Sequence, residues 1–93
     1  METLPSLNGA TIIDVRNDWE FDTAHVEGAL NIPLYDIPGR IKEIETLPKP
    51  IILCCASGNR SGQATTYLKQ QGFTEVYNGG SWLSVNGLKV NQG

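Results

Sequence analysis

The amino-acid sequence predicts an α/β fold, a small parallel sheet of about four or five strands flanked by helices. Short apolar runs with strand character alternate along the chain with segments whose apolar residues recur at helical spacing. This order of elements is typical of a parallel sheet covered by helices. The chain has 93 residues, of which 40% are hydrophobic, and this is enough for one core. We therefore expect a single domain over residues 1–93.

The first half of the chain contains two strand patterns and two helix patterns. Residues 11–15 are predicted to form a strand, and Asp18 is predicted to be the N-cap of a short helix that follows. Residues 28–33 predict a second short strand, which stops at a proline. Beyond it, three isoleucines recur at helical spacing, Ile37, Ile41 and Ile44. They predict a helix that ends before Pro48.

The second half begins with the most hydrophobic strand pattern, residues 51–54. A continuous apolar run of this kind is typical of a strand buried on both faces of a sheet. A helix is then predicted from Arg60 or Ser61 to about Gln71, with Gly72 as its C-terminal stop.

The end of the chain shows weaker patterns. Residues 75–77 predict a last short strand, and the glycines after Asn78 predict a turn into an irregular tail, with little support for a final helix. Among the aromatic residues, Trp19 and Phe21 are expected to fill the core, and Trp82 to line the rim of a site.

Charge and hydropathy exclude several classes of function. A nucleic-acid partner requires a basic face, whereas this chain has a formal net charge of −3. The sequence has no apolar stretch long enough to cross a membrane, so no membrane association is expected. The expected location is the cytoplasm, or the periplasm if a signal peptide has been removed.

The carboxylates are distributed unevenly along the chain. Five of the ten lie within residues 14–27, whereas residues 46–74 contain none. An acid-free segment favours the binding of an anion. We therefore expect an anion site within residues 46–74.

The cysteines also limit the chemistry. Cys54 and Cys55 are adjacent, so they cannot form a disulfide framework. Together with His25, the single histidine, they are too few for a zinc site. We expect no metal and no organic cofactor.

Residues 55–60 are predicted to carry the chemistry. A buried strand delivers Cys55 into a loop of small residues, and the loop opens directly into a helix. This arrangement aims backbone N–H groups and the positive end of a helix dipole at the sulfur. Such surroundings lower a cysteine pKa from about 8.5 to around 6–7, so the thiol becomes mostly thiolate at neutral pH. The same N–H groups can hold an anion attached to the sulfur, and Gly58 permits the positive φ that the loop needs to curl.

Four strings of residues resemble the rhodanese-like sulfurtransferase family, in particular its small single-domain phage-shock members. They are I-I-D-V-R at 12–16, A-H-V-E-G-A-L-N-I-P-L at 24–34, C-A-S-G-N-R-S-G-Q-A at 55–64 and N-G-G at 78–80. They occur in the order and spacing of the family, which implies a rhodanese-like fold.

The resemblance also implies a reaction and its site. Cys55 attacks a small anionic donor such as thiosulfate, becomes a persulfide, and passes the outer sulfur to cyanide or to a thiol, including a protein thiol. The residues implied to hold the transferred sulfur are Ala56, Ser57, Gly58, Asn59, Arg60 and Ser61. The reaction needs no cofactor.

Several side chains near this loop have two interpretations. Arg60 either binds an anionic donor through its planar guanidinium or holds the loop by bonding carbonyls or a carboxylate such as Glu27. Ser61 either bonds the sulfur or caps the helix. Scaffold roles are expected for Asp14, for Arg16 paired with a carboxylate, and for His25 tying loops together.

Two rival functions follow from the same loop. Counted from Cys54, the spacing to Arg60 is C-x5-R, as in cysteine phosphatases and related arsenate reductases, whereas C-x4-R from Cys55 suits a single sulfur atom. Leu53 stands where the phosphatase pattern has histidine, and Cys54 should point to the opposite face of the sheet, into the core. The second rival is a module that binds a persulfide or anion without turnover.

Overall fold

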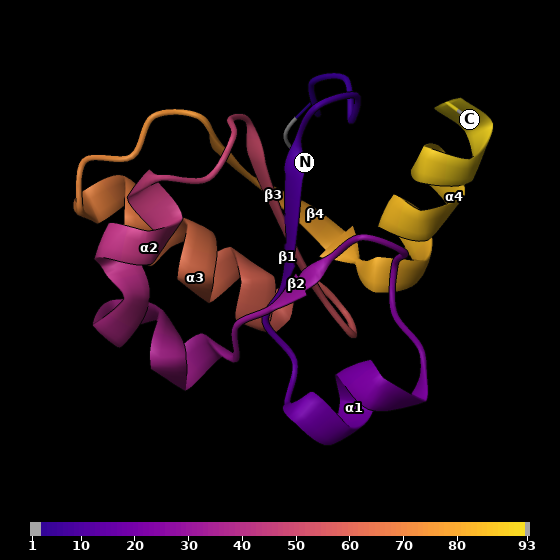
Figure 1. Ribbon diagram of the computed structural model, residues 1–93, viewed down its shortest axis with the longest axis horizontal. Helices are drawn as coiled ribbons and strands as arrows, with labels where there is room; N and C mark the ends of the chain where they lie inside the picture. Colours follow the sequence, from indigo (N-terminus) through magenta and orange to yellow (C-terminus); the bar gives the residue numbers. More distant parts are fainter. Residues whose placement is uncertain (1–2, 93) are drawn as a thin grey trace.

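The fold is a four-stranded parallel sheet with helices on both faces (Figure 1). The computed structural model describes residues 3–92. In chain order the elements are β1 (Thr11–Asp14), α1 (Asp18–Thr23), β2 (Leu30–Asn31), the 3₁₀ helix η1 (Leu34–Arg40), α2 (Ile41–Glu45), β3 (Ile51–Cys55), α3 (Asn59–Gln70), β4 (Val76–Ser81) and α4 (Trp82–Gln92). The strand order is β2-β1-β3-β4, so the predicted α/β class with a small parallel sheet is confirmed.

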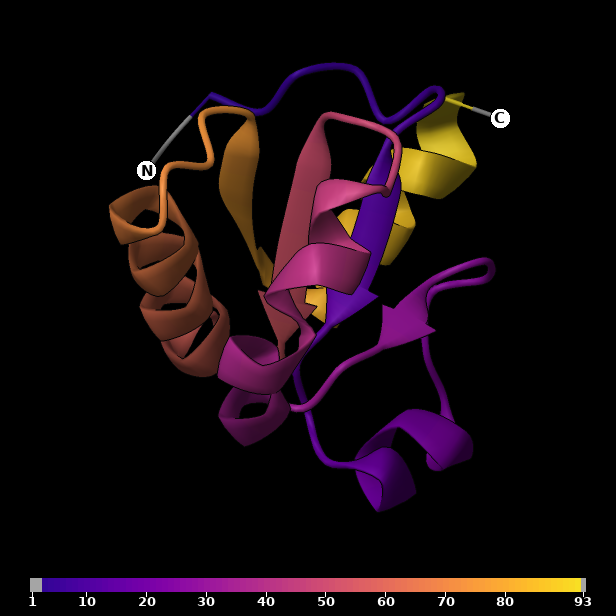
Figure 2. The same ribbon diagram turned by 60° about the vertical axis from the view of Figure 1, so that its left-hand side comes forward.

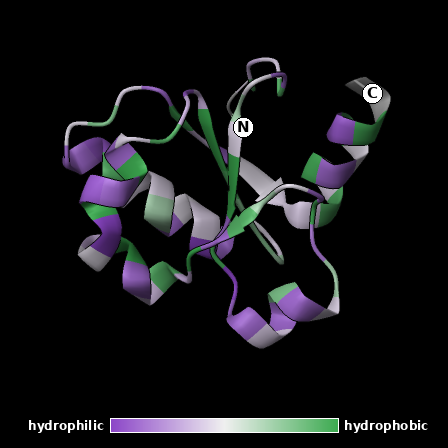
Figure 3. Ribbon diagram, viewed as in Figure 1, coloured by the Kyte–Doolittle hydropathy of each residue, from purple (hydrophilic) through white to green (hydrophobic). Residues whose placement is uncertain are grey.

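The two faces of the sheet bury two separate clusters of apolar side chains. Successive residues of a strand point to opposite faces, and in β3 Leu53 and Cys55 join one cluster, whereas Ile52 and Cys54 join the other. η1, α2 and α3 cover the first face, and α4 covers the second (Figure 2). Hydrophobic residues are concentrated on β1 and β3 and alternate with hydrophilic ones along the helices (Figure 3).

The beginning of α1 differs from the prediction. Its N-cap is Asn17, not Asp18, because Asn17 has extended backbone while Asp18 is already helical. The carboxylate of Glu20 accepts a hydrogen bond from the N–H of Asn17 at 3.0 Å, which closes the first turn.

The expected burial of Trp19 and Phe21 is only partly correct. Trp19 is 67% exposed, and Phe21 is half-buried with its ring stacked on His25. The reason is the position of α1, which lies beyond the carboxyl end of the sheet and buries none of its residues (Figure 1). A helix at the end of a sheet, rather than on its face, has no core to fill.

The irregular tail predicted after Asn78 is wrong. β4 continues through both glycines to Ser81, and α4 follows it directly. A Cβ atom on Gly79 would come within 2.7 Å of Val85 and 2.8 Å of Ile52, so glycine here allows α4 to pack closely on the sheet. Gly79 is therefore a packing feature, whereas Gly80 has a φ of +83° and lies where the pairing of β4 with β3 shifts in register.

The other boundaries lie near those predicted. β2 is shorter than residues 28–33, and the helix predicted from the three isoleucines is divided at Arg40 into η1 and α2. α3 begins at Asn59, one residue before the prediction, and Gly72 after it has a φ of +99°, as a C-terminal stop requires. Within residues 3–92, no helix is long and apolar enough to cross a membrane.

Candidate active site

Cys55 is the last residue of β3, an interior strand of the sheet. All four strands are parallel, so their carboxyl ends meet at one edge, where open α/β sheets bind ligands. The chain then turns through Ala56, Ser57 and Gly58 into α3. Gly58 is the N-cap of α3 with a φ of +99°, and a Cβ atom there would lie 3.1 Å from the Cα of Gly80. The turn thus depends on glycine both for its backbone angle and for the close approach of β4.

Hydrogen-bond donors converge on the sulfur of Cys55. The N–H of Gly58 donates to Sγ at 3.0 Å and the N–H of Ser61 at 3.4 Å, while the hydroxyl oxygen of Ser61 also lies 3.4 Å away. The side chain of Cys55 is fully buried. Burial raises the pKa of the thiol, but the hydrogen bonds from Ser61, Ser57 and Gly58 outweigh it, so this pKa lies below its ordinary value. The loop therefore favours the thiolate.

Asn78 of β4 holds both the loop and the hydroxyl of Ser61. Its Oδ1 accepts the N–H of Gly80 at 3.0 Å, and its Nδ2 donates to the carbonyl of Gly58 at 3.1 Å. Oδ1 is an acceptor only, so the hydroxyl of Ser61, 2.7 Å away, must donate to it. The same hydroxyl lies 3.4 Å from Sγ of Cys55, so it is within reach of both acceptors. The sequence contained Asn78 in the N-G-G string, but its role was not predicted.

Arg60 pairs with Glu20, not with the expected Glu27. The two guanidinium nitrogens Nη1 and Nη2 donate to the two carboxylate oxygens at 2.7 and 3.0 Å. The hydrogen bond from Arg60 lowers the pKa of Glu20 to about 2, and the pair in turn raises the pKa of Arg60. The pair links α1 to the first turn of α3, beside the cysteine loop. This contact could not be predicted from the sequence pattern, because the two residues are 40 positions apart.

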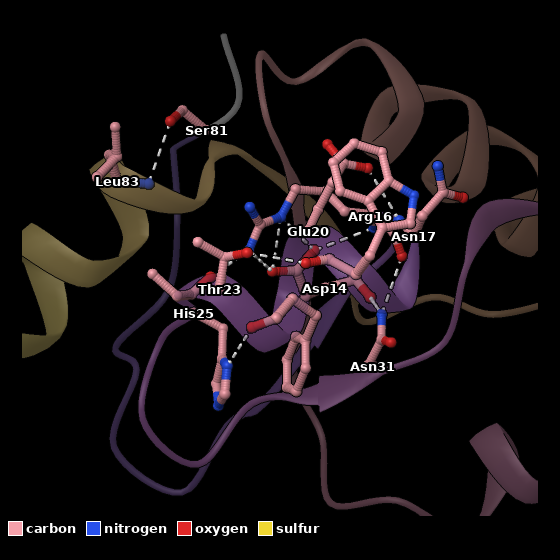
Figure 4. Close-up of polar contacts among 12 residues, drawn as sticks. Asp14, Arg16, Asn17, Glu20, Thr23, His25, Asn31, Ser81 and Leu83 are labelled. Carbon is pink, nitrogen blue, oxygen red and sulfur yellow. Dashed lines mark hydrogen bonds and ion pairs between the residues drawn. The ribbon is translucent and has the colours of Figure 1, made fainter.

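A buried ion pair supports the neighbouring strand, as Figure 4 shows. The guanidinium of Arg16 donates to both carboxylate oxygens of Asp14 and to the carbonyl of Ala24, which agrees with the expected scaffold roles. Asn31 donates to the carbonyls of Asp14 and Arg16, and thereby fixes the end of β1 against β2. These residues shape the carboxyl edge of the sheet.

Two further residues differ in detail from their predicted positions. Nδ1 of His25 donates to the carbonyl of Phe21 in its own segment at 2.6 Å, so that bond closes the end of α1 and does not join separate loops. Trp82 is half-buried against the second core cluster, and its ring lies 4.9 Å from the guanidinium carbon of Arg16. Trp82 thus packs against the guanidinium of Arg16, which is paired with Asp14.

Cys54 lies in the second core cluster, on the face opposite Cys55. Burial, and then the charge of Asp14, raise its pKa to about 12. It is therefore a neutral core residue at physiological pH, as predicted. This argues against the phosphatase interpretation that counts the loop from Cys54.

An open groove of about 540 Å³ begins at the loop and follows α3. Its lining residues are all uncharged and include Gly58, Asn59, Gln63 and Tyr67. A deeper hollow of about 280 Å³, between Lys49 and the segment after α3, lies at the amino ends of β3 and β4, away from the cysteine. Among residues 3–92, no cluster of His, Cys, Asp and Glu could hold a metal ion.

Fold and site together define a parallel α/β domain in which the amides of a strand-to-helix loop hold one cysteine sulfur. The chain belongs to the Rhodanese-like domain family, whose model matches residues 2–82.

The chain is similar in sequence to several bacterial proteins. Over 69 residues, the chain is 46% identical to the uncharacterized protein YqhL of Bacillus subtilis, covering 74% of this chain and 54% of that protein. It is 36% identical over 69 residues to the thiosulfate sulfurtransferase GlpE of Pseudomonas syringae, covering 74% of this chain and 64% of that protein. It is also 33% identical over 90 residues to GlpE of Pseudomonas aeruginosa, covering 92% and 81%. The chain thus spans less than two thirds of the first two relatives.

Solved structures of similar fold include two single-domain proteins. A rhodanese with anions from Escherichia coli superposes with a TM-score of 0.73 at 34% identity, covering 81% of this chain and 89% of that one. The human single-domain sulfurtransferase TSTD1 gives a TM-score of 0.65 at 25% identity, with coverage of 83% and 80%.

Proposed function

We propose that the protein is a rhodanese-type sulfurtransferase that carries sulfane sulfur on Cys55 as a persulfide, from a donor such as thiosulfate to a thiol or cyanide. One observation supports this most directly. Three hydrogen-bond contacts converge on a single sulfur at the carboxyl edge of the sheet, and the pKa of that thiol lies below its ordinary value. The thiolate is the form that attacks sulfur.

The first half-reaction loads the enzyme. The Cys55 thiolate attacks the outer sulfur of thiosulfate and forms a new S–S bond. The S–S bond of thiosulfate breaks, and its electron pair leaves on sulfite. The persulfide keeps the negative charge on its outer sulfur, so charge balances and no oxidant is needed.

The second half-reaction unloads it. A thiolate or cyanide attacks the outer sulfur, the electron pair returns to Cys55, and the product is a new persulfide or thiocyanate. The loop amides of Ala56, Ser57, Gly58, Asn59 and Ser61 stabilise the charge of the outer sulfur, and Arg60 adds hydrogen bonds from its remaining N–H groups. Because the side chain of Cys55 is fully buried, the loop must shift to admit the donor.

Mass spectrometry of the intact protein after thiosulfate treatment tests this proposal. We expect a gain of one sulfur atom that is absent in Cys55→Ser and retained in Cys54→Ser, followed by its loss on addition of cyanide. If the gain were retained in Cys55→Ser, another residue would carry the sulfur and the assignment to Cys55 would be wrong. A gain that neither cyanide nor a thiol removes would favour a binding module without turnover.

An activity comparison separates the remaining rival. Thiosulfate:cyanide transfer and aryl-phosphate hydrolysis are measured on the same preparation. Transfer without hydrolysis is expected, because Arg60 is engaged by Glu20 and Cys54 is a neutral core residue. Phosphatase turnover alone would refute the proposal.

A further inference from the structure

Arg60 is the only charged residue of the cysteine loop, and its charge is already paired. Residues 55–59 and Ser61 carry no charged side chain, and the groove along α3 is lined by uncharged residues. The guanidinium of Arg60 donates to both carboxylate oxygens of Glu20, with side chains only 32% and 17% exposed. An anion at the loop would therefore meet amide dipoles and little net positive charge.

Glu20 is fixed in this position from a second direction. Its Oε1 also accepts the N–H of Asn17 in the first turn of α1, so the carboxylate is held in place by its own helix. A second cation that acts on Glu20, Arg16, is likewise bound to a carboxylate, that of Asp14. The pairing is thus a built feature of this edge of the sheet.

We infer that Glu20 determines which sulfur donors the site accepts, because by neutralising Arg60 it favours donors with a single negative charge, such as organic persulfides and thiosulfonates, over the dianion thiosulfate. The inference rests on the proposed function. When the Cys55 thiolate attacks thiosulfate, three negative charges meet. When it attacks a thiosulfonate, two meet: the S–S bond of the donor breaks, a sulfinate leaves with the electron pair, and the persulfide keeps one charge.

Two donors of matched shape test the inference. Methanethiosulfonate is thiosulfate with one charged oxygen replaced by a methyl group. In Glu20→Gln, the amide keeps the size of the side chain and can still accept from Asn17 and Arg60, but it no longer cancels the charge of Arg60. One unpaired charge several ångströms away in water changes the rate constant for reaction with a monoanion about threefold. For a dianion the rate constant changes by about the square of that factor.

We therefore expect kcat/KM to rise about ninefold for thiosulfate and about threefold for methanethiosulfonate in Glu20→Gln. The difference between the increases for the two donors should become smaller as salt is added, because salt screens the charge of Arg60. Glu43→Gln is the matched control. Glu43 lies on α2, away from the loop, and its carboxylate forms a bidentate pair with Arg40 at the end of η1. The substitution removes the same charge and should leave the ratio of the two donors unchanged.

A second readout does not require sulfur transfer. Iodoacetate and iodoacetamide alkylate the same thiolate and differ by one charge, so the ratio of their rates cancels the thiolate fraction. We expect this ratio to rise about threefold in Glu20→Gln and to stay constant in Glu43→Gln.

The outcomes separate the two proposals. If wild type takes sulfur from neither donor, the proposed function fails, while the alkylation ratio still decides the role of Glu20. If Glu20→Gln leaves the alkylation ratio unchanged, or changes both donors equally, the inference is overturned and Glu20 only holds the loop.

Discussion

Replacing Gly58 by alanine should damage both the stability and the chemistry of the loop, and the chain contains a matched control. Gly58 and Gly72 both have a φ of +99°. Alanine at Gly72 would meet no atom within 4 Å, whereas at Gly58 its Cβ would lie 3.1 Å from the Cα of Gly80. The two substitutions share the cost of a left-handed alanine and the same change in the unfolded chain, and they differ in the contact with β4 and in proximity to Cys55.

The magnitude follows from these contacts. A left-handed non-glycine residue costs about 1–2 kcal/mol, which both variants should lose. Gly58→Ala should lose about 1 kcal/mol more, because Gly80 is backbone that can shift only with β4. Any shift of Gly58 lengthens its 3.0 Å hydrogen bond to Sγ, so the pKa of Cys55 should rise.

The assay combines urea unfolding with the pH dependence of iodoacetamide alkylation. We expect Gly58→Ala to move the pH profile of alkylation to higher pH and to slow alkylation at pH 7, because a weaker amide hydrogen bond raises the pKa of Cys55. Gly72→Ala should leave the alkylation rate unchanged. Equal losses of stability with unchanged alkylation in both variants would refute the argument that Gly58 holds the amide donors in place.

Three further predictions concern titrating groups. Ser61→Ala should raise the pKa of Cys55, because the hydrogen bond from the Ser61 side chain contributes most to stabilising the thiolate. Alkylation at pH 7 should slow severalfold, and Ser61→Thr should restore its rate. An unchanged pH profile of alkylation in Ser61→Ala would contradict this role of Ser61. The native protein should take up one carbamidomethyl group at pH 8 and a second only after denaturation, because the pKa of Cys54 is about 12; two groups on the native protein would show that Cys54 is accessible. Because Arg60 lowers the pKa of Glu20 to about 2, the pair stabilises the fold above the ordinary pKa of 4.5 and loses this contribution as the pH falls toward 2. Urea unfolding should find wild type more stable than Glu20→Gln by about 1 kcal/mol at pH 7 and equal to it near pH 2, and a difference independent of pH would contradict the ion pair.

The cysteine loop could be predicted from the sequence because its determinants are local. An apolar run, small residues and a helix pattern follow one another within residues 51–64, so the position of Cys55 at a strand end needs no knowledge of the rest of the chain. Roles that depend on distant contacts were missed. Asn78 reaches the loop from β4, and Glu20 reaches Arg60 from α1.

The acid-free segment shows how a sequence pattern can differ from its spatial counterpart. Residues 46–74 contain no carboxylate along the chain, which indicated an anion site. In the folded protein Glu20, from outside that segment, binds the loop arginine and removes most of its charge. Charge counted along the chain therefore does not predict the electrostatic field at the loop.

Glycines 79 and 80 illustrate the same limit for the fold. Glycine pairs are typical of turns, and the local pattern offers no alternative. The packing of α4 on the sheet, with Val85 against Gly79, explains the first glycine, and a φ of +83° explains the second. Similarly, the hydrophobicity of Trp19 does not reveal that its helix lies beyond the end of the sheet.

The two adjacent cysteines provide an internal comparison of the forces that set a thiol pKa. Cys54 and Cys55 are both fully buried on the same strand, yet the pKa of Cys54 is raised to about 12 and that of Cys55 is lowered. Burial raises both pKa values, and only at Cys55 do hydrogen bonds to the sulfur outweigh it. What differs is the face: Cys54 lies among apolar side chains, whereas Cys55 faces the N–H groups of the turn into α3 and the hydroxyl of Ser61. A one-residue step along β3 therefore separates a thiol with a raised pKa from one with a lowered pKa, because the loop brings its donors to one face of the sheet only.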